Sequence, residues 1–413
     1  MNLRTIFIYL AFTLLFLSAC KPMSEESGST KTSREGRAAL GTAEDFSIEL
    51  IKSLDEASLK QSWLLQNQTA NRLWADLNRP VKREKADFVV WQTWYTREDL
   101  QRIFRRAYQQ LGKEGRAERK ALSEDLIAQS MAYHDTEQFA EEGWDGASFD
   151  RWLSRYVGKE NAIPGLNKVL MNREALVVIL KNYAAINTCL RNLEGAKPCH
   201  ELSLAFPKGA AFLKTAWRRG QIDGDFKVPY YQTDDLLAQL SGSEWRSHDS
   251  GIPLSTNAYR METPSHQVFH LVGIHLNTRL DTQWLYSSVW AENNSYRACT
   301  SMDFHGLANP LAKGWEKSVA DAEAQLGHSW CSSPYLEGGE QNHKTNCVGC
   351  HQHAGSAWTE ESFTTALTEN LSALTQDAKV HSRSDQVWSL LNGPEPLSSI
   401  IYQEIDYFDV YDL

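Results

Sequence analysis

The sequence lacks several features that would assign it to a common class. It has no methionine after Met302, and none of the motifs G-x-S-x-G, G-x-x-x-x-G-K-[ST] or H-E-x-x-H. It therefore carries no signature of an α/β-hydrolase, a P-loop nucleotide-binding protein or a zinc protease. Beyond Leu17, no segment is apolar over a length that would span a membrane. The net charge of −10 argues against nucleic acid binding, which selects basic surfaces.

Cysteine is scarce, with seven residues in 413, but its placement is informative. The segment Cys347-Val348-Gly349-Cys350-His351 matches C-x-x-C-H, the attachment motif for c-type haem. Two thiols with this spacing reach both vinyl groups of one haem and form thioethers. The following imidazole then lies under the iron. We therefore expect one covalent haem c, anchored by Cys347 and Cys350, with His351 as the proximal iron ligand.

Two other interpretations of the motif remain open. Cys347 and Cys350 together with His343 or His353 form a possible zinc site, although a single C-x-x-C without a second pair is a weak zinc signal. Exported thiolates also tend to oxidise. A thioredoxin-like dithiol is the other interpretation, and it requires a βαβ context that the flanking sequence does not have.

The N-terminus predicts export. Arg4 provides a positive charge, and Ile6–Leu17 is an apolar stretch too short for a comfortable membrane span. The stretch ends in Leu17-Ser18-Ala19-Cys20, which resembles the lipobox of bacterial lipoproteins. That resemblance implies cleavage before Cys20, acylation of Cys20, and a location in the bacterial cell envelope, anchored to a membrane and facing the periplasm. An ordinary signal peptide with an unrelated cysteine is the alternative.

The remaining four cysteines are an even number in an oxidising compartment. They are Cys189, Cys199, Cys299 and Cys331. Four cysteines allow three pairings, and we expect the two local disulfides, Cys189–Cys199 and Cys299–Cys331. Free buried thiols are the alternative.

Composition and periodicity divide the chain and predict an α+β fold. Residues 21–45 are polar and rich in Ser, Gly and mixed charge, which is typical of a flexible tether. The next region has apolar residues at helical spacing, and the one after it is rich in β-formers. The predicted parts are a signal peptide (1–19), a tether (20–45), a helical domain (46–204), a β-containing domain (205–336) and a haem-bearing segment (337–413).

Four elements are predicted in detail. Thr96 is a good helix N-cap, followed by Glu98 and Asp99 in the first turn, and the helix also carries three arginines expected to form a solvated face: Arg102, Arg105 and Arg106. A further helix is expected over 165–193. Two strands, 269–274 and 284–290, are expected to be joined by a hairpin-like link at 278–282.

The second axial ligand of the haem iron is not evident from the motif. Small c-type cytochromes usually supply a methionine downstream, and this chain has none there. His353 is too close to the proximal histidine to reach the opposite haem face. The other candidates are His381 and, upstream, His275, Met302 and His305. We take His275 as the first choice among them.

Two segments, Phe212–Arg219 and His270–Trp290, resemble stretches in a group of uncharacterised bacterial envelope proteins with a c-type motif near the C-terminus. Relatives often have Phe-Glu-His after the aromatic strand, whereas this chain has Trp290-Ala291-Glu292. The resemblance implies a shared fold and a haem, and brings no substrate. Lys214 and Arg218, four residues apart, are candidates for contact with a haem propionate or an acidic substrate, or form a surface face.

These features favour single-electron transfer in the envelope, with another redox protein as partner. A carrier with one haem rarely needs so many additional residues, which leaves room for two alternatives. One is a haem-dependent peroxidase or oxidase, although most dihaem peroxidases would contain a second C-x-x-C-H. The other is a sensory or binding lipoprotein with a structural haem. An accessible, five-coordinate iron would favour either alternative.

Overall fold

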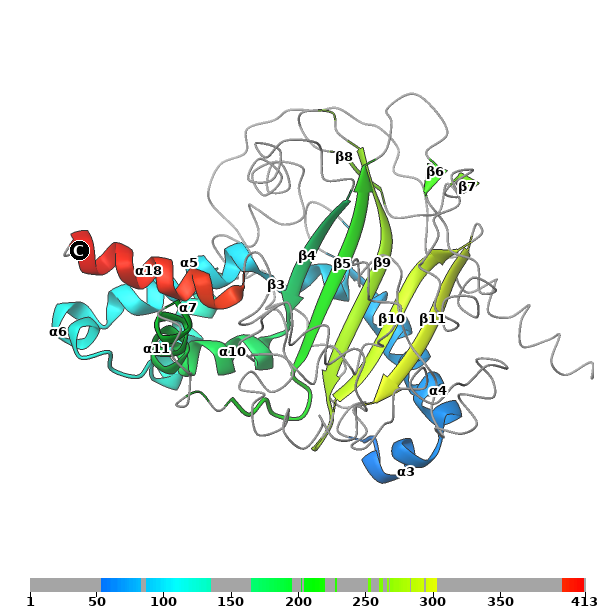
Figure 1. Ribbon diagram of the computed structural model, residues 1–413, viewed down its shortest axis with the longest axis horizontal. Helices are drawn as coiled ribbons and strands as arrows, with labels where there is room; N and C mark the ends of the chain where they lie inside the picture. The colour runs from blue at the N-terminus through cyan, green and yellow to red at the C-terminus, as the bar shows by residue number, and fades with distance from the viewer. Residues whose placement is uncertain are drawn as a thin grey trace, which may run out of the picture.

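The computed structural model describes a mixed α+β protein built around one antiparallel sheet (Figure 1). Helix α4 (Trp63–Leu77) crosses one face of the sheet, and a bundle of helices lies beside the strands β3 (Tyr95–Thr96) and β4 (Gly165–Met171). The structure describes residues 53–82, 87–134, 165–194, 202, 204–219, 227–228, 252–253, 260–262, 266, 268–282, 284–292, 295–302 and 396–411.

The bundle and its neighbours contain the remaining described helices. They are α3 (Glu56–Gln61), the 3-10 helix η1 (Val90–Thr93), α5 (Arg97–Gln110), α6 (Gly112–Ala117), α7 (Glu124–Tyr133), α10 (Arg173–Lys181), α11 (Tyr183–Glu194) and α18 (Leu397–Tyr411). The other strands are β1 (Pro80–Lys82), β2 (Asp87–Val89), β5 (Ala211–Arg219), β6 (Lys227–Val228), β7 (Ile252–Pro253), β8 (Arg260–Glu262), β9 (Val268–Arg279), β10 (Trp284–Glu292) and β11 (Ser295–Met302).

Within the described ranges, seven strands form the main sheet, in the order β11-β10-β9-β5-β4-β3, with β8 paired to β9. Strands β9 and β10 form the predicted antiparallel hairpin, and their connection is confined to residues 280–283. The sheet also takes β3 and β4 from the region predicted to be mainly helical. The β structure therefore begins earlier in the chain than periodicity indicated.

The single helix predicted over 165–193 is wrong in its first part, because Gly165–Met171 is strand β4. Leu170 and Met171 are both buried, on opposite faces of the sheet, so the strand ends in the short apolar run Val169–Met171 and lacks the alternation that would distinguish it from a helix. Asn172 marks the change. Its Oδ1 accepts hydrogen bonds from the backbone N–H groups of Ala175 and Ala211, at 3.2 and 3.0 Å. It thereby caps α10 and ties the helix start to β5.

The helix predicted after Thr96 is confirmed as α5. Thr96 Oγ1 accepts a hydrogen bond from the backbone N–H of Asp99 at 3.3 Å, and the Asp99 carboxylate accepts one from the N–H of Thr96 at 2.7 Å. This reciprocal capping box satisfies two N–H groups at the helix start. The apolar residues of α5 are buried in the bundle, and they are Leu100, Ile103, Phe104, Ala107 and Tyr108.

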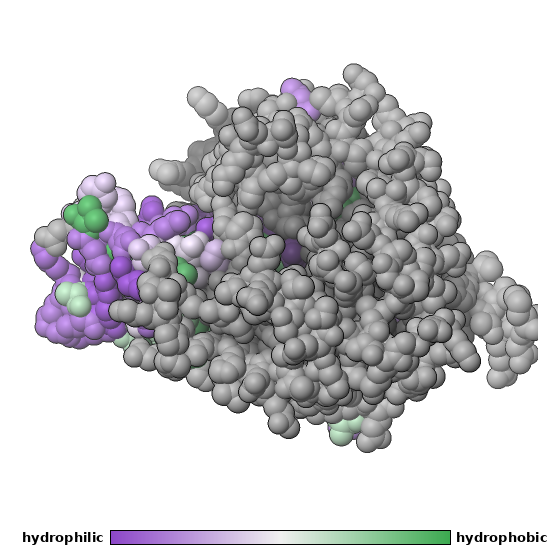
Figure 2. Space-filling view, in the orientation of Figure 1, coloured by the Kyte–Doolittle hydropathy of each residue, from purple (hydrophilic) through white to green (hydrophobic). Residues whose placement is uncertain are grey.

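Two hydrophobic cores lie on opposite faces of the sheet. The first joins Phe212, Trp284 and Tyr286 to the inner faces of the bundle helices, including α5, α10, α11 and α18. The second lies between the other sheet face and α4, where Trp74 Nε1 donates a hydrogen bond to Ser287 Oγ at 2.6 Å. Because the sheet is covered on both faces, its strands are apolar on both sides. The visible surface of the bundle is mostly hydrophilic (Figure 2).

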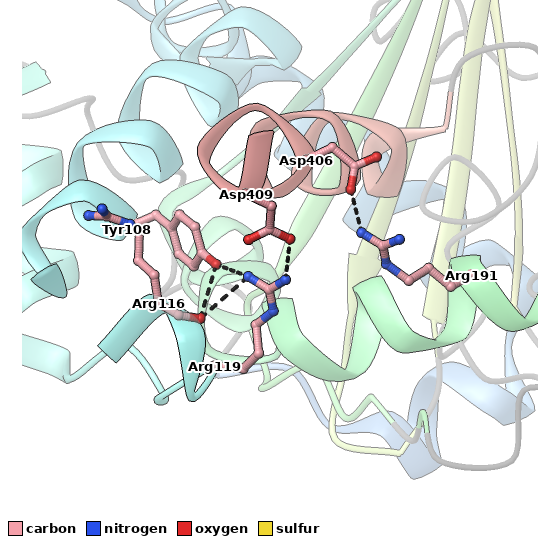
Figure 3. A network of polar contacts seen from close by, with 6 residues as sticks. All are labelled: Tyr108, Arg116, Arg119, Arg191, Asp406 and Asp409. Atoms are coloured by element: carbon pink, nitrogen blue, oxygen red, sulfur yellow. Dashed lines mark hydrogen bonds and ion pairs between the residues drawn. The ribbon is translucent and has the colours of Figure 1, made fainter. Parts of the chain in front are cut away.

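Helix α18 is held in the bundle by arginines from distant parts of the chain. Arg105 on α5 makes a two-pronged contact with Glu404, at 2.6 and 2.7 Å. Arg119 pairs with Asp409 at 2.5 Å, and Arg191 pairs with Asp406 (Figure 3). The apolar side of the same helix enters the first core through Leu397, Ile400, Ile401, Ile405 and Phe408.

The arginines predicted to form a solvated face on α5 are exposed or half-buried, and each also has a partner within the protein. Arg102 Nη2 donates a hydrogen bond to Asp99 of the same helix at 2.6 Å, and Arg105 binds Glu404 of α18. The guanidinium carbon of Arg106 lies 3.5 Å from the centre of the Tyr133 ring of α7. Arg105 and Arg106 therefore join α5 to two neighbouring helices at the edge of a face that still meets solvent.

Candidate functional site

Most residues of the predicted haem and lipid sites lie outside the described residues. These are Cys20, Cys199, Cys331, Cys347, Cys350 and His351, together with His305, His343, His353 and His381. Their assignments therefore stay predictions. The described elements do bracket the haem motif along the chain, since β11 ends at Met302 and α18 begins at Leu397.

One of the predicted disulfide cysteines is observed in a bond. Cys189 on α11 is buried in the first core and takes part in a disulfide. Its predicted partner, Cys199, lies outside the described residues, so the pairing itself stays a prediction. Cys299 lies in β11 as the register partner of Ser288 on β10.

The described part of the predicted site centres on His275, which occupies the middle of β9. Its register partners are Lys214 on β5 and Ser288 on β10. Directly opposed residues in antiparallel strands have Cβ atoms about 5 Å apart on one face of the sheet. The three side chains thus form a polar row across a sheet whose faces are otherwise largely apolar. We call Lys214, His275 and Ser288 the polar row.

The imidazole of His275 is held by two contacts. Its Nδ1 lies 2.6 Å from Ser288 Oγ, and its ring stacks on Tyr286 at 6.1 Å between centroids, with 12° between the planes. His275 is 7% exposed, and Ser288 is fully buried. Since Tyr286 belongs to the first core, the ring is on the same face of the sheet as the helix bundle. The histidine therefore has a fixed orientation inside the protein.

A bulge changes which residues share a face of β9. The register between β5 and β9 shifts after Ala216, so that Leu271 and Ile274, three residues apart, both pack in the second core. A regular strand would place residues three apart on opposite faces. By alternation from Leu271, the half-buried His270 then falls on the face of His275. Gly273 lies at this bulge, and an isolated glycine inside a strand is its one local sign in the sequence. Periodicity alone would have placed His270 on the opposite face from His275.

Lys214 and Arg218 do not have the close spacing first expected for residues four apart. Both lie on strand β5, where four residues span about 13 Å, more than twice the separation on a helix. Lys214 is paired with His275, and Arg218 with His270. The two basic residues thus belong to separate positions along the sheet, each next to a histidine, with the Ala216–Gly273 pair between them.

A second polar cluster, centred on Asp99, was not identified from the sequence. The Asp99 carboxylate is buried and contacts Arg102 at 2.6 Å and His134 Nε2 at 3.0 Å. Burial raises the pKa of Asp99, but the contact with His134, the charge of Arg102 and the N–H of Thr96 outweigh it and hold the pKa well below its ordinary value of 3.8. Because all these contacts hold α5 to α7 and to its own N-terminus, the cluster is structural.

Within the ranges that the structure describes, no group of three or more His, Cys, Asp or Glu side chains has an arrangement that would bind a metal ion. The helices in these ranges include none with the length and apolarity of a membrane span. Comparisons with protein-family models, with curated proteins and with solved structures gave no match. The site is therefore interpreted from its own chemistry.

Proposed function

We propose that the protein is an electron carrier of the bacterial cell envelope that uses one covalently bound c-type haem. The observation that carries the proposal is the C-x-x-C-H motif at Cys347–His351. In this proposal Cys347 and Cys350 hold the haem through thioethers and His351 binds its iron. The bound haem supplies an iron that accepts one electron from one envelope protein and passes it to another.

The N-terminus supports the proposed location. Cytochromes of this type receive their haem outside the cytoplasm, and the segment up to Ala19 has the properties of an export signal. Acylation of Cys20 would keep the protein at a membrane surface. The polar residues 21–45 would then act as a tether between the lipid and the folded body.

The test of the haem proposal uses the full chain produced in a host that attaches c-type haem. The denatured protein is expected to retain a peroxidase-active haem stain on a gel, with one added haem by mass spectrometry. The double variant Cys347→Ala/Cys350→Ala should lose both signals, because no thioether can form. The matched control Ser356→Ala, close to the motif, should keep them. Zinc in place of iron in metal analysis would refute the proposal.

The test of the anchor is independent of the haem. Metabolic labelling with a palmitate analogue should mark the wild type and not Cys20→Ala, whereas Ser24→Ala in the tether should label normally. Mass spectrometry should find Cys20 as the first residue of the mature chain. An intact Met1 on the purified protein would contradict the lipoprotein assignment.

The visible spectrum distinguishes the carrier from the enzyme and sensor alternatives. A carrier is expected to have a six-coordinate iron whose reduced form does not react with carbon monoxide. Binding of carbon monoxide to the wild type would indicate an open iron and favour an enzyme or a sensor. This single measurement therefore separates the functions that a c-type motif allows.

A further inference from the structure

The polar row has the arrangement of a histidine prepared to bind a metal. Histidines that bind metals almost always donate their second ring N–H to an oxygen acceptor, which fixes both the tautomer and the orientation of the ring. In His275 the second nitrogen is Nδ1, and Ser288 Oγ lies 2.6 Å from it. When Nδ1 donates this hydrogen bond, the lone pair of the ring is on Nε2, the nitrogen that points away from the backbone. Stacking on Tyr286 holds the same orientation.

Some positions of the sheet face next to His275 carry small residues, whereas Lys214 and Tyr286 border the imidazole on the same face. Gly273 precedes His275 by two positions on the same face, and its register partner on β5 is Ala216. On the other side, the register partner of His275 is Ser288, also a small residue. The backbone is therefore close to the surface of the sheet around the imidazole. A flat, wide group bound through Nε2 would meet few large side chains along these directions.

The last described strand before the haem motif lies beside the polar row. Cys299 on β11 is the register partner of Ser288, so the strand that leads into the haem-bearing segment passes directly beside the row. The predicted Cys299–Cys331 disulfide would return the chain to this same strand, and Cys331 precedes Cys347 by only 16 positions. Helix α18 then fixes the far end of the segment on the bundle.

We infer that His275 is the second axial ligand of the haem iron and that Ser288 is its positioning residue. This inference rests on the proposed function, because it assigns a role toward the haem held by Cys347 and Cys350. Lys214, the other register partner of His275, contributes a cationic group beside the ligand and suits a haem propionate. The upstream histidine thus takes the place of the missing downstream methionine.

The same Ser–His contact has a rival interpretation as a nucleophile and its base. In serine hydrolases the base contacts the serine through Nε2 and uses Nδ1 to bind a carboxylate. Here the serine is on Nδ1, and Ser288 is fully buried in the middle of β10. The contact therefore matches the support of a metal ligand better than that of a catalytic base.

The experiment compares variants of the purified, haem-loaded full chain by haem stain, absorption spectrum and carbon monoxide binding. His275→Ala should keep the covalent haem stain, bind carbon monoxide when reduced, and recover the wild-type spectrum on addition of imidazole. His275→Met should gain the weak long-wavelength band of methionine–iron ligation, which tests the same position with a side chain that still binds iron. Far-ultraviolet circular dichroism checks that each variant is folded.

Ser288→Ala should make the reduced iron about tenfold to a hundredfold more accessible to carbon monoxide, the usual cost of losing the support of a metal-binding histidine. The matched control is Ser287→Ala. Ser287 is adjacent in sequence and equally buried, but lies on the opposite face and bonds Trp74. Its spectrum and carbon monoxide response should be those of the wild type.

The outcomes separate this inference from the proposed function. A wild type without covalent haem overturns both. A wild type that keeps its haem stain, with an unchanged spectrum in His275→Ala and His275→Met, overturns the ligand assignment and leaves the carrier proposal standing. Labelling of Ser288 by a serine-reactive fluorophosphonate would assign the contact to a nucleophile and overturn the inference.

Discussion

At the scale of single residues, Asp99 shows how one buried carboxylate connects several parts of the protein. It closes the capping box of α5 through Thr96, and it contacts both Arg102 and His134. A buried carboxylate is tolerated because each contact stabilises its charge. The sequence predicted the cap at Thr96, but the histidine partner arrives from α7, 35 positions later, and local pattern gives no sign of it.

Asp99 should make stability depend on pH on the acid side. Its pKa is lower in the folded than in the unfolded protein, so its contribution is fully present above about pH 5 and is lost as the pH falls below about 4. Asp99→Asn should lower the free energy of unfolding by about 3 kcal/mol at neutral pH and flatten its decline below about pH 4. Urea titrations at a series of pH values measure both effects. The exposed Asp125→Asn on α7 is the control, and equal pH slopes in wild type and Asp99→Asn would contradict the prediction.

Asn172 offers a second prediction at this scale. It caps α10 and bonds the backbone of β5, and its Nδ2 donates to the carbonyl of Gly209 at 2.8 Å. Asn172→Ala should lower the free energy of unfolding by about 3 kcal/mol, since a cap is lost and buried backbone groups lose their partner. Ser123→Ala, which removes the exposed cap of α7, should cost only about 1 kcal/mol. If urea denaturation showed that both variants lower the free energy of unfolding by similar amounts, the prediction that the buried cap contributes more than the exposed one would be refuted.

At the scale of elements, α18 combines an apolar face in the first core with acidic residues that bind arginines of other elements. Hydrogen bonding to Glu404, together with its charge, raises the pKa of Arg105 despite the opposing effect of partial burial. Glu404 is 2% exposed, whereas its arginine partner is about half exposed. The carboxylate has little contact with water, so it depends more than the arginine does on this ion pair to stabilise its charge. The contact joins α5 to a helix about 300 positions away in the chain.

Glu404→Gln should loosen the docking of α18. The change removes the charge from a buried group that accepts hydrogen bonds from Arg105 and Gln101, at a cost of about 2 kcal/mol after allowing for solvent near the arginine. Amides of α18 should then exchange with deuterium about thirtyfold faster if they exchange through local opening. Gln403→Ala, at an exposed neighbouring position, is the control. Unchanged exchange in α18 would show that apolar packing alone holds the helix.

At the scale of the whole molecule, the sequence predicted the mixed class and the β9–β10 hairpin but not the assembly of the sheet. Strand β4 was missed because its end is buried on both faces, and the bulge near Ala216 has only Gly273 as a local sign. The pairing of β4 with β5 depends on contacts between residues distant in the chain, as does the packing of α18 on α5. Of the candidate site, His275 was found from its position in a strand-like run. Ser288 was not, because neither it nor the adjacent Ser287 can be assigned to a face or a partner until the register is known.

Helix α18 should hold the two sides of the haem-bearing segment together even when the chain is cut. A protease site inserted within residues 355–395 should yield two fragments that co-elute under native, reducing conditions, because α18 buries five apolar side chains in the first core. Adding Phe408→Ala, which costs about 3–5 kcal/mol, should release the C-terminal fragment. Val410→Ala, at a position 72% exposed, should not. Separation of the fragments without any substitution would contradict this role.

The position of α18 near the end of the sequence also determines when the first core can be completed during synthesis. A chain emerges from its N-terminus, so the cysteines at 347 and 350 appear before the helix that completes the first core. Until Leu397–Tyr411 has been synthesised, the apolar faces of α5 and α11 lack one of the helices that cover them in the folded protein. The final closure of the bundle therefore follows the appearance of Cys347 and Cys350. Under the proposed function, this leaves an interval in which an enzyme that attaches haem would meet the motif before the bundle has closed.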